Sequence, residues 1–541
     1  MMTDRQKQLV KNAEAHRQLV LDAERWLWAH PQTGYTEWQA NEYLVEKYES
    51  LGYELVKAGN IPGFYTDIKT GRPGPTLCIM GELDALDIAN HPESVNGMTH
   101  CCGHHAQSAA LLGLAAAFKE PGALDGLCGT IRLMAVPAEE MIQLSFREEL
   151  RKQGTIHYMG GKVEFMYRGF FDDVDIAMMV HGGGSKTDID FSCGLGNNGC
   201  MAKTITYKGR SSHAGGAPHL GINAQYAAML GLQACNDLRE TFQEKDTIRF
   251  HPILMGAKVA VNIIPDEMKI ESYVRGRTIE AMKRENKKVN RALAGAALAM
   301  GAGEKLCDRP GYSPEIHDPA FMKLVEQCCG QLVGPERVDF DYEEWSTGSS
   351  DFGDVTCVMP GVQFSASGSQ GTAHGIDYYV ADPERMCVNS VRPSSSSPMP
   401  FSPTMGPPPR RSLRAISPST PPSRPTSRPS TTSFWIKTPS PTTKTATPRW
   451  TFKTTNFQKA PRESPRGAFL CNDHPMKIGP STSHPAAFPS VQKNPRRCWG
   501  EVRLVGGCVG SLWVRGRGRP FFAGPKNGPS HPQPFHGTNS R

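Results

Sequence analysis

Three neighbouring stretches of the sequence decide the fold: TLCIMGELDAL at residues 76–86, HCCGHH at 100–105 and AQSAALLGLAAAF at 106–118. The first is mostly apolar, with two carboxylates near its end, as expected of a buried strand. The third is rich in Ala and Leu and is long enough to form a helix. The middle stretch holds three histidines and two cysteines, and it therefore lies at a predicted strand-to-helix turn.

This turn has the composition of a metal site. Imidazole and thiolate bind borderline-soft divalent metals, and carboxylates complete such sites. Gly103 leaves the corner unobstructed, so the side chains of Cys102 and His104 can point into one crevice. A buried cysteine pair beside surface histidines is the alternative interpretation of the same residues.

Strands and helices alternate on both sides of the turn. Apolar stripes predict one helix from Thr3 to about Ala29 and a second from about Trp38 to Leu51. Further buried strands are predicted at Thr130–Val136 and Asp175–Val180. The pattern predicts an α/β catalytic domain with a mixed, mostly parallel sheet flanked by helices.

The pattern changes near residue 199 and resumes after about residue 307. Between them we expect a compact two-layer α+β unit, inserted into the larger domain. Its predicted elements are a strand, a helix, two strands and a helix: Met201–Lys208, Ile222–Phe242, Thr247–Leu254, Met268–Arg275 and Ile279–Met300.

Charge divides the chain into an acidic body and a basic tail. The net charge is +7, but the last 151 residues hold 23 Lys and Arg against 3 acids, which leaves −13 for the rest. Residues 391–450 contain 15 Pro and no Asp or Glu, so they cannot bury enough apolar surface to offset chain entropy. We therefore predict a catalytic domain in two segments, 1–195 and 307–390, with the inserted domain at 196–306 between them. A disordered tail is predicted at 391–541.

Composition also excludes some classes of protein. No run of 18 or more apolar residues is present, which argues against a membrane span. The polar N-terminus lacks the apolar core of a secretory signal. The 15 cysteines follow no regular framework, as in proteins of a reducing compartment. We therefore expect a cytoplasmic protein with free thiols and no membrane partner.

Further donors lie where predicted strands end. Glu139 and Glu140 follow one strand, His181 follows another, and His374 lies in a loop of small residues. Singly, such residues are more often surface charges or structural histidines. Because α/β sheets bind ligands at the carboxyl ends of their strands, these donors are expected to meet. The predicted metal site is formed by Cys102, His104, Glu140 and one or both of His181 and His374.

In their order along the chain, these motifs resemble peptidase family M20, in its amidohydrolase branch with aminoacylases, hippurate hydrolases, auxin-conjugate hydrolases and related dipeptidases. The similarity covers roughly residues 19–384. It rests on five segments: HPQTGY at 30–35, GELDAL at 81–86, HCCGHH at 100–105, PAEE at 137–140 and GSSDF at 348–352. Each is weak alone, but the ordered set is specific. The resemblance implies a zinc-exopeptidase-like catalytic domain and an inserted lid or dimerisation domain.

The resemblance also implies the composition of the site. Two divalent metal ions, of zinc, manganese or cobalt, would share Cys102 as a bridging ligand. The other implied ligands are His104, Glu140, His181 and His374. Glu139 would be the general base that acts on a water between the metals.

Three residues of the inserted unit match substrate-side positions of the family. His213 matches a lid histidine that stabilises the oxyanion of the reaction. Asn262 and Arg275 match positions that hold the substrate carboxylate, for which a guanidinium can form a bidentate clamp. For Arg275, an ordinary solvated sheet face is the alternative.

Several positions depart from the family pattern. His105 stands where Asp is usual, Gln107 replaces a common His, and Ser350 replaces the usual Glu of its motif. The interval before His181 is longer than in the auxin-conjugate hydrolases and holds a charged stretch at 147–152. These differences bear on the substrate more than on the reaction.

The expected function is hydrolysis of the amide bond of an N-acyl amino acid or dipeptide, by a homodimer formed through the inserted unit. One alternative is a metal-binding homologue with impaired catalysis, because the tail begins where the family has a terminal helix that packs on the sheet. Another is an interaction protein that acts through its tail. Nucleic acid is not the expected partner, although the basic charge would favour it. A shifted reading frame or retained intron after about Val388 is a further hypothesis for the tail.

Overall fold

The structure, a computed structural model of the chain, describes residues 2–183, 188–256, 259–396 and 432–434. The chain separates into two units, Met1–Thr443 and Lys444–Arg541, and the second lies outside the described residues. Most of the predicted tail also lies outside the described residues, and its disorder stays a prediction there. The tail residues that the structure does describe form most of α11 (Asn389–Ser396) and the strand β21 (Thr432–Phe434).

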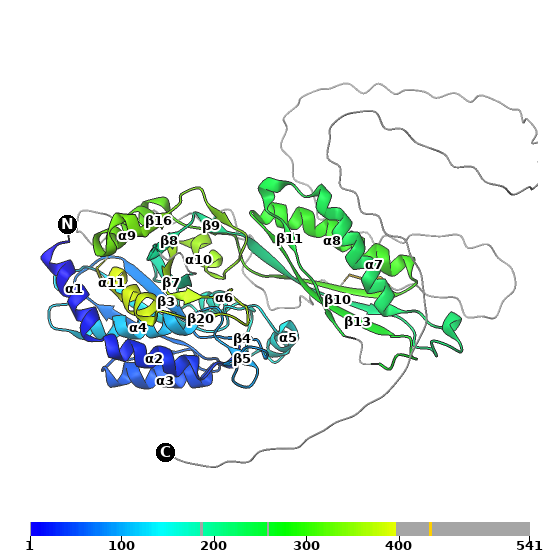
Figure 1. Cartoon of the computed structure of the whole chain (residues 1–541), viewed down its shortest axis with the longest axis horizontal. Coiled ribbons are helices and arrows are strands. Elements are labelled where there is room, and N and C mark those ends of the chain that lie inside the picture. The colour runs from blue at the N-terminus through cyan, green and yellow to red at the C-terminus, as the bar shows by residue number, and fades with distance from the viewer. Residues whose placement is uncertain (1, 184–187, 257–258, 397–431, 435–541) are drawn as a thin grey trace, which may run out of the picture. The chain divides into compact units, whose positions relative to one another are not determined.

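A mixed sheet forms the centre of the larger domain. Among the described residues it has eight strands, in the order β1-β2-β6-β3-β7-β18-β8-β16. In that order the strands span Val56–Lys57, Phe64–Lys69, Thr130–Val136, Thr76–Glu82, Ile176–Gly183, Gly361–Ser367, Phe191–Cys193 and Val338–Phe340. Figure 1 labels β3, β7, β8 and β16 of this sheet. The central strands β6, β3, β7 and β18 are parallel, whereas β2 and β8 pair antiparallel with β6 and β18. The predicted fold class is confirmed.

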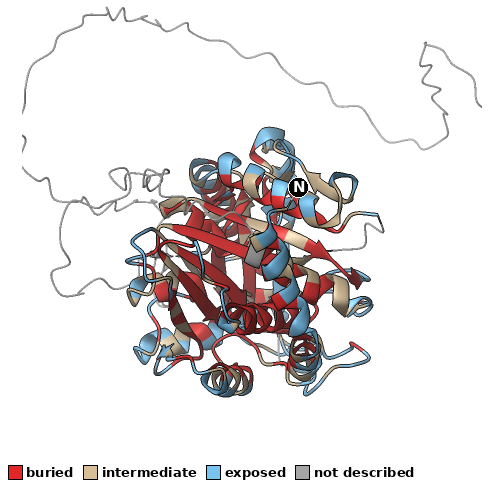
Figure 2. Cartoon of the chain, turned by 90° about the vertical axis from the view of Figure 1, so that its left-hand side faces the viewer, coloured by how far each residue is buried: buried red, intermediate tan, exposed pale blue. Residues whose placement is uncertain are grey.

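Helices cover both faces of the sheet, because alternate side chains of each strand enter different cores. Leu77 and Ile79 of β3 belong to the larger core, with α1, α2, α3, α4, α9 and α11, and Cys78 and Met80 to a smaller core, with α6 and α10. In that order the helices span Asp4–Ala15, Arg17–Trp28, Trp38–Ser50, His104–Lys119, Pro319–Val333, Asn389–Ser396, Gly161–Tyr167 and Phe352–Val358. Figure 2 shows buried strands surrounded by helices with exposed outer faces. No helix in the described part of the chain is long and apolar enough to cross a membrane.

The first helix predicted from the sequence is two helices in the structure. Thr3 caps α1 as expected, since its hydroxyl accepts from Gln6 N at 3.2 Å while the Gln6 side chain accepts from Thr3 N at 2.8 Å, a capping box. Between α1 and α2 the backbone of His16 leaves the helical region, at φ −99° and ψ 13°. The apolar stripe continues across this break, so the periodicity of the sequence did not reveal it.

The inserted unit has its own antiparallel sheet. Its strand order is β11-β13-β10-β14-β21, with β12 also paired to β13. In that order the strands span Arg249–Phe250, Glu267–Gly276, Gly199–Lys208, Gly303–Pro310, Thr432–Phe434 and Ile253–Met255. Helices α7 (Ala224–Asp237) and α8 (Ile279–Ala299) share one core with this sheet. The unit is a two-layer α+β structure.

Three details of this unit differ from the prediction. Its sheet includes β21, which lies within the segment 391–541 that was predicted as a disordered tail. The strand expected at 247–254 is divided into β11 and β12 around Pro252, which has no N–H to donate to a ladder. Strand β14 was missed, because its charged residues Glu304, Lys305, Asp308 and Arg309 hide the strand pattern. The expected domain boundary at residues 306 and 307 falls inside this strand.

Short elements join the two parts. The chain leaves and re-enters the larger domain through a small sheet, β15-β9-β17, which spans Glu315–Ile316, Gly196–Asn197 and Trp345–Ser346. There the His317 N–H donates to Leu195 O at 2.9 Å. The remaining short elements are α5 (Leu144–Lys152), β4 (Leu86–Asp87), β5 (Met98–Thr99), β19 (Ser369–Gln370), β20 (Tyr379–Val380), η1 (Pro218–Leu220), η2 (Leu238–Thr241), η3 (Glu244–Asp246), η4 (Pro335–Arg337) and η5 (Glu384–Val388).

The larger domain ends in η5 and α11, which pack against α1, α4 and α9. The expected boundary after residue 390 falls inside α11, where Val391 is only 1% exposed. Gly113 of α4 permits the close approach, because a Cβ there would lie 2.3 Å from Val20 Cγ2 and 3.1 Å from Val391 Cγ2. A helix therefore does follow the last predicted donor loop, contrary to the expectation that none would.

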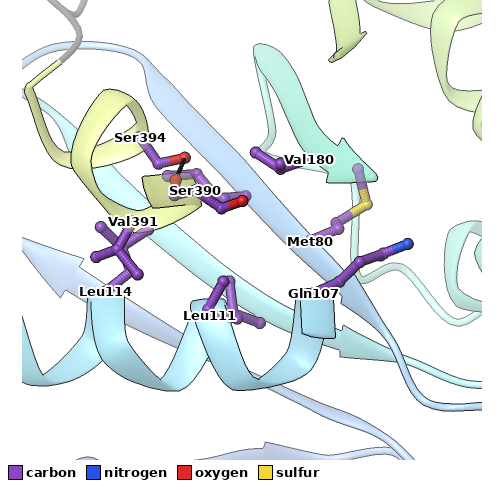
Figure 3. Close-up of a pocket in the computed structure, with 10 residues that line it drawn as sticks. Met80, Gln107, Leu111, Leu114, Val180, Ser390, Val391 and Ser394 are labelled. Atoms are coloured by element: carbon purple, nitrogen blue, oxygen red, sulfur yellow. Dashed lines mark hydrogen bonds between the residues drawn. The ribbon is translucent and has the colours of Figure 1, made fainter. Parts of the chain in front are cut away.

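A cavity of about 20 Å³ lies beneath α11 (Figure 3). Its lining includes Leu111 of α4 and Val180 of β7, and α11 contributes Ser390 and Ser394. The two hydroxyls donate to the carbonyls of Met386 and Ser390, at 2.5 and 2.9 Å. Both hydroxyls are thus satisfied by carbonyls one turn earlier, in η5 and α11, but the serines fill the core less fully than larger apolar side chains would.

Replacing Val391 by Ala tests whether α11 belongs to the fold. Loss of two methyl groups at a buried contact should lower the free energy of unfolding by about 2 kcal/mol, measured by urea denaturation. Leu298→Ala is the control, because Leu298 is 65% exposed on α8 and its loss should cost less than about 0.5 kcal/mol. Equal effects of the two changes would contradict the packing of α11.

Candidate metal centre

The predicted donors come from separate elements that meet at the carboxyl edge of the main sheet. His181 lies near the end of β7, Glu140 follows β6, and His104 is the first residue of α4. Cys102 lies in the turn before α4, and His374 lies in the loop between β19 and β20. Parallel neighbours end at the same edge of a sheet, which is why donors so far apart in sequence converge.

Two donor triads share one thiol. Cys102, His104 and His181 form the first triad, and Cys102, Glu140 and His374 form the second. Within each triad the potential ligand atoms all lie within 4.8 Å of one another. The described residues contain a third such group, formed by Glu82, His104 and Glu139, which shares His104 with the first triad. All five predicted metal ligands are thus brought together, with the predicted general base beside them.

The orientation of His104 fits a metal ligand. Its Nδ1–H donates to the carboxylate of Asp84 at 3.0 Å, whereas its buried Nε2 faces the carboxylates of Glu82 at 3.2 Å and Glu139 at 3.9 Å. A carboxylate on one imidazole nitrogen fixes the tautomer that leaves the other free to ligate. The second oxygen of Asp84 accepts from the backbone N–H of Glu140 at 2.8 Å. Asp84 therefore links the two triads, and the donor set fits a divalent metal.

Electrostatics prepares the shared thiol and the ligand carboxylate. Burial alone raises the pKa of Cys102, but His104 and His181 lower it to about 6. Burial likewise raises the pKa of Glu140, but a hydrogen bond and charge from His374 lower it to about 2. Both groups are therefore anionic at neutral pH, as metal ligands must be.

Glu139 has the opposite shift. Burial, together with the charges of Glu82 and Glu140, raises the pKa of Glu139 well above its ordinary value. Two adjacent carboxylates thus lie in environments that push their pKa values apart. Such a pair divides ligand and proton-transfer roles in many active sites.

A buried charge network of Lys162, Glu82 and Asp351 lies next to the donor triads. Lys162 and Glu82 are fully buried, and the Lys162 ammonium bonds both Glu82 and Asp351. Burial raises the pKa of Glu82, but Lys162 lowers it to about 2. Gln107, which departs from the family pattern, donates to Glu82 at 2.8 Å. The network was not predicted, because its members are far apart in sequence and only the fold brings them together.

His105 faces away from the metal ligands. Its Nε2 lies 3.2 Å from a carboxylate oxygen of Glu24 on α2, and its ring meets Trp28 edge to face at 5.0 Å. The substitution of His for Asp at this position therefore acts on the packing of α2 against α4.

A cleft of about 400 Å³ opens onto the donors. Its lining includes Cys102, Glu139, Glu140, His181 and His374. On the side of the inserted unit it is lined by Cys200, His251, Tyr273 and Arg275, and elsewhere by Leu86, Met141, Ile142, Asn197, Tyr312, Gly348, Ser349, Ser350 and Gln363. Arg275 therefore lines the cleft, and its Nε donates to His251 Nε2 at 3.0 Å; its role in substrate binding stays a prediction.

The other two predicted substrate residues do not line this cleft. His213 and Ile263 form a β-bridge, and the backbone N–H of Ala214 donates to Asn262 O at 2.9 Å. The structure thus brings His213 and Asn262 together on neighbouring loops, apart from the cleft residues. His251, Tyr273 and Tyr312 were missed, since no motif marks them.

The family assignment rests on comparison with known proteins. Residues 78–391 match the model described as peptidase family M20/M25/M40, which is more than half of the chain. The chain belongs to this family. The resemblance drawn from the motifs is confirmed, and it supports the expected enzyme class, the hydrolases of amide and peptide bonds.

Two relatives illustrate the range of the family. One of the subunits of the p-aminobenzoyl-glutamate hydrolase of Escherichia coli (strain K12) is 28% identical over 299 residues, which are 53% of this chain and 56% of that protein. The Xaa-Arg dipeptidase of Homo sapiens is 26% identical over 372 residues, which are 65% of this chain and 78% of that protein. The chain thus spans little more than half the length of the bacterial relative.

Among solved structures, the chain is similar to the Bacillus subtilis YXEP protein, described as a dinuclear metal binding peptidase from the M20 family. The TM-score is 0.52 at 20% identity, and the match covers 71% of this chain and 98% of that one. At this identity the similarity concerns the fold, and it agrees with the predicted α/β class.

Cobalt titration of Cys102→Ser tests the shared thiol. We expect wild type to bind two equivalents of Co²⁺ with thiolate-to-cobalt absorption, and the variant to lose that absorption and bind both equivalents at least about 10-fold more weakly. Cys101→Ser is the matched control, because Cys101 is buried in an apolar cluster beside the triads. His374→Ala should weaken one equivalent only. Wild-type binding by Cys102→Ser would contradict a bridging role.

Proposed function

We propose that this protein is a metal-dependent amidohydrolase that cleaves the amide bond of an N-acyl amino acid or dipeptide. The observation that carries the proposal is the pair of donor triads sharing Cys102, with the high-pKa carboxylate of Glu139 beside them in an open cleft. The names of the two relatives, a hydrolase of p-aminobenzoyl-glutamate and a dipeptidase, support this substrate class.

The two triads would hold two divalent ions, and zinc, manganese and cobalt all suit mixed nitrogen, oxygen and sulfur donors. The residues that would hold them are Cys102, His104, Glu140, His181 and His374. When bound, such ions acidify water and polarise a carbonyl oxygen.

Glu139 would transfer the proton. Its carboxylate lies 3.9 Å from His104 Nε2, so it faces the ligand atoms rather than solvent. As general base it takes a proton from the attacking water, and as general acid it gives that proton to the amine nitrogen that leaves. A carboxylate whose pKa is raised above its ordinary value suits both steps.

The two sides of the cleft suit the two ends of the substrate. Arg275 provides hydrogen-bond donors for the carboxylate of the amino-acid portion, since a guanidinium can bind it through two parallel bonds, and His251 Nε2 accepts from Arg275 Nε and so orients the guanidinium. Leu86, Met141 and Ile142 provide apolar surface for the acyl portion.

His213 and Asn262 require a different arrangement to act on the substrate. The proposal assigns them to substrate binding after a movement of the inserted unit, or through a second copy in a homodimer. The homodimer and the cytoplasmic location stay predictions, as does the absence of a nucleic-acid or membrane partner.

Glu139→Gln is the decisive test of the reaction. The variant should lose at least about 10³-fold in kcat, since it removes both proton transfers, while it keeps two equivalents of metal. The assay is release of free amino acid from pooled N-acyl amino acids and dipeptides, with and without chelator. Glu149→Gln, at an exposed position on α5, is the control. Equal hydrolysis by wild type and Glu139→Gln would reject the proposed base, and chelator-insensitive release would reject the metal requirement.

Arg275→Met tests substrate recognition. Loss of a charged hydrogen-bonding partner should raise KM about 10- to 100-fold for substrates with a free carboxylate, and it should change little for the corresponding carboxamides. Arg249→Met is the matched control, because Arg249 pairs with Arg275 in adjacent strands but does not line the cleft. Equal sensitivity of acids and amides would contradict carboxylate binding by Arg275.

A further inference from the structure

The turn that presents Glu139 and Glu140 is strained. Ala138, directly before them, has φ 57°, a left-handed conformation that side chains other than glycine rarely adopt. Gln143, shortly after them, has φ 52°. Residues in such conformations persist only where surrounding contacts determine them, and they are common at functional sites.

The strained residue is held at both backbone polar groups. The N–H of Ala138 donates to a carboxylate oxygen of Glu37 at 2.7 Å, and Glu37 is fully buried. The carbonyl of Ala138 accepts from Arg147 Nη1 at 3.3 Å and from the backbone N–H of Gly161 at 3.2 Å. Buried Glu37 and buried Arg147 thus hold the two peptide groups that flank Ala138.

Arg147 reaches the next carbonyls as well. Its Nη2 donates to the carbonyl of Glu140, and its Nη1 also donates to the carbonyl of Met159 at 2.6 Å. The carbonyl of Glu139, which lies between those of Ala138 and Glu140 in the sequence, accepts from the hydroxyl of Tyr312. The fork of one guanidinium therefore spans the catalytic turn from Ala138 to Glu140.

The position of Arg147 is unusual for a charged residue. It is 1% exposed and lies in α5, inside the long interval between Glu140 and His181. Its hydrogen bonds go to main-chain carbonyls, and its guanidinium lies 5.5 Å from the ring centroid of Tyr35. A buried charge is costly to desolvate, and an apolar side chain of similar volume often serves stability as well. The fork geometry, rather than stability, is thus the property that this position uses.

The guanidinium of Arg147 leaves no room for a side chain at Gly34. A Cβ added at Gly34 would lie 2.4 Å from Arg147 Nη2 and 2.9 Å from Ala138 Cα. The loop after α2 therefore closes against the guanidinium and the strained residue together. Any displacement of Arg147 would be transmitted to the backbone of the turn.

We propose that Arg147 is a positioning residue for the reaction: with Glu37 it fixes the strained backbone of residues 138–140, so that Glu140 stays at the metal-ligand position and Glu139 at the proton-transfer position. The proposal rests on the proposed function in its account of Glu139. Its account of Glu140 concerns metal binding and can be tested without turnover.

The main variants are Arg147→Met, which removes the fork, and Arg147→Lys, which keeps the charge but offers a single donor head. Arg147→Met should lower kcat about 10- to 100-fold, because the turn that carries Glu139 and Glu140 is displaced. KM should change less than about 3-fold, because the cleft residues proposed to bind the substrate are unchanged. The variant should also weaken binding of the Co²⁺ equivalent held by Glu140 about 10-fold. Arg147→Lys should fall between wild type and Arg147→Met in both measurements.

Arg132 is the matched control, as a second buried arginine of the same domain. It lies on β6, is 2% exposed, and bonds the carboxylates of Asp67 and Asp173 at 2.6 to 3.0 Å. Arg132→Met should lower the melting temperature, because it leaves two carboxylates without their partner. It should leave kcat per folded molecule and Co²⁺ affinity unchanged.

The outcomes separate the two proposals. Loss of stability alone by Arg147→Met, as for Arg132→Met, would overturn the positioning role. So would wild-type kcat and Co²⁺ affinity in folded Arg147→Met. If that variant does not fold, Arg147→Lys decides by the same two measurements. If wild type hydrolyses none of the substrates, the proposed function fails, and the Co²⁺ titration still decides whether Arg147 places Glu140.

Discussion

The thiolate of Cys102 is the point on which the site depends, because both donor triads contain it. A shared ligand fixes two potential metal positions relative to each other, whereas separate triads could move independently. The turn that carries Cys102 is correspondingly tight: Gly103 has φ 87°, and a Cβ there would lie 2.8 Å from Met386 Cε and Tyr378 Oη. The geometry of the shared ligand thus depends on a glycine and on side chains contributed by the end of the domain.

Close to Cys102, the fold shifts the pKa values of two adjacent glutamates in opposite directions. Glu139 and Glu140 are adjacent, yet His374 lowers the pKa of one while burial and neighbouring carboxylates raise that of the other. The difference arises because the turn directs the two side chains to different surroundings. By holding the backbone of this turn, Arg147, Glu37 and Asp84 also determine the surroundings of the two carboxyl groups, and so their pKa values.

Much of the fold and the donor set could be predicted from the sequence, and the reasons are physical. The parallel strands are nearly continuous apolar runs, and their carboxyl ends meet at one edge, so donors such as Glu140 and His181 could be expected to converge. The supporting residues could not be predicted in this way. Lys162 and Arg147 bear charges that a sequence pattern assigns to the surface, and only long-range packing shows them to be buried. His213 and Asn262 were placed by family resemblance, and the cleft does not include them.

The discontinuous path of the larger domain has a consequence for synthesis of the protein. Cys102, Glu140 and His181 all precede the inserted unit, but His374 and the helix α11 follow it. The 193 residues from His181 to His374 take roughly 10–40 s to translate at about 5–20 residues per second. The first triad can therefore assemble on the ribosome while the second still lacks a ligand. Strands β10 to β14 and helices α7 and α8 of the inserted unit are likewise synthesised before His374 and α11. The order of translation sets the order in which the two donor triads are completed.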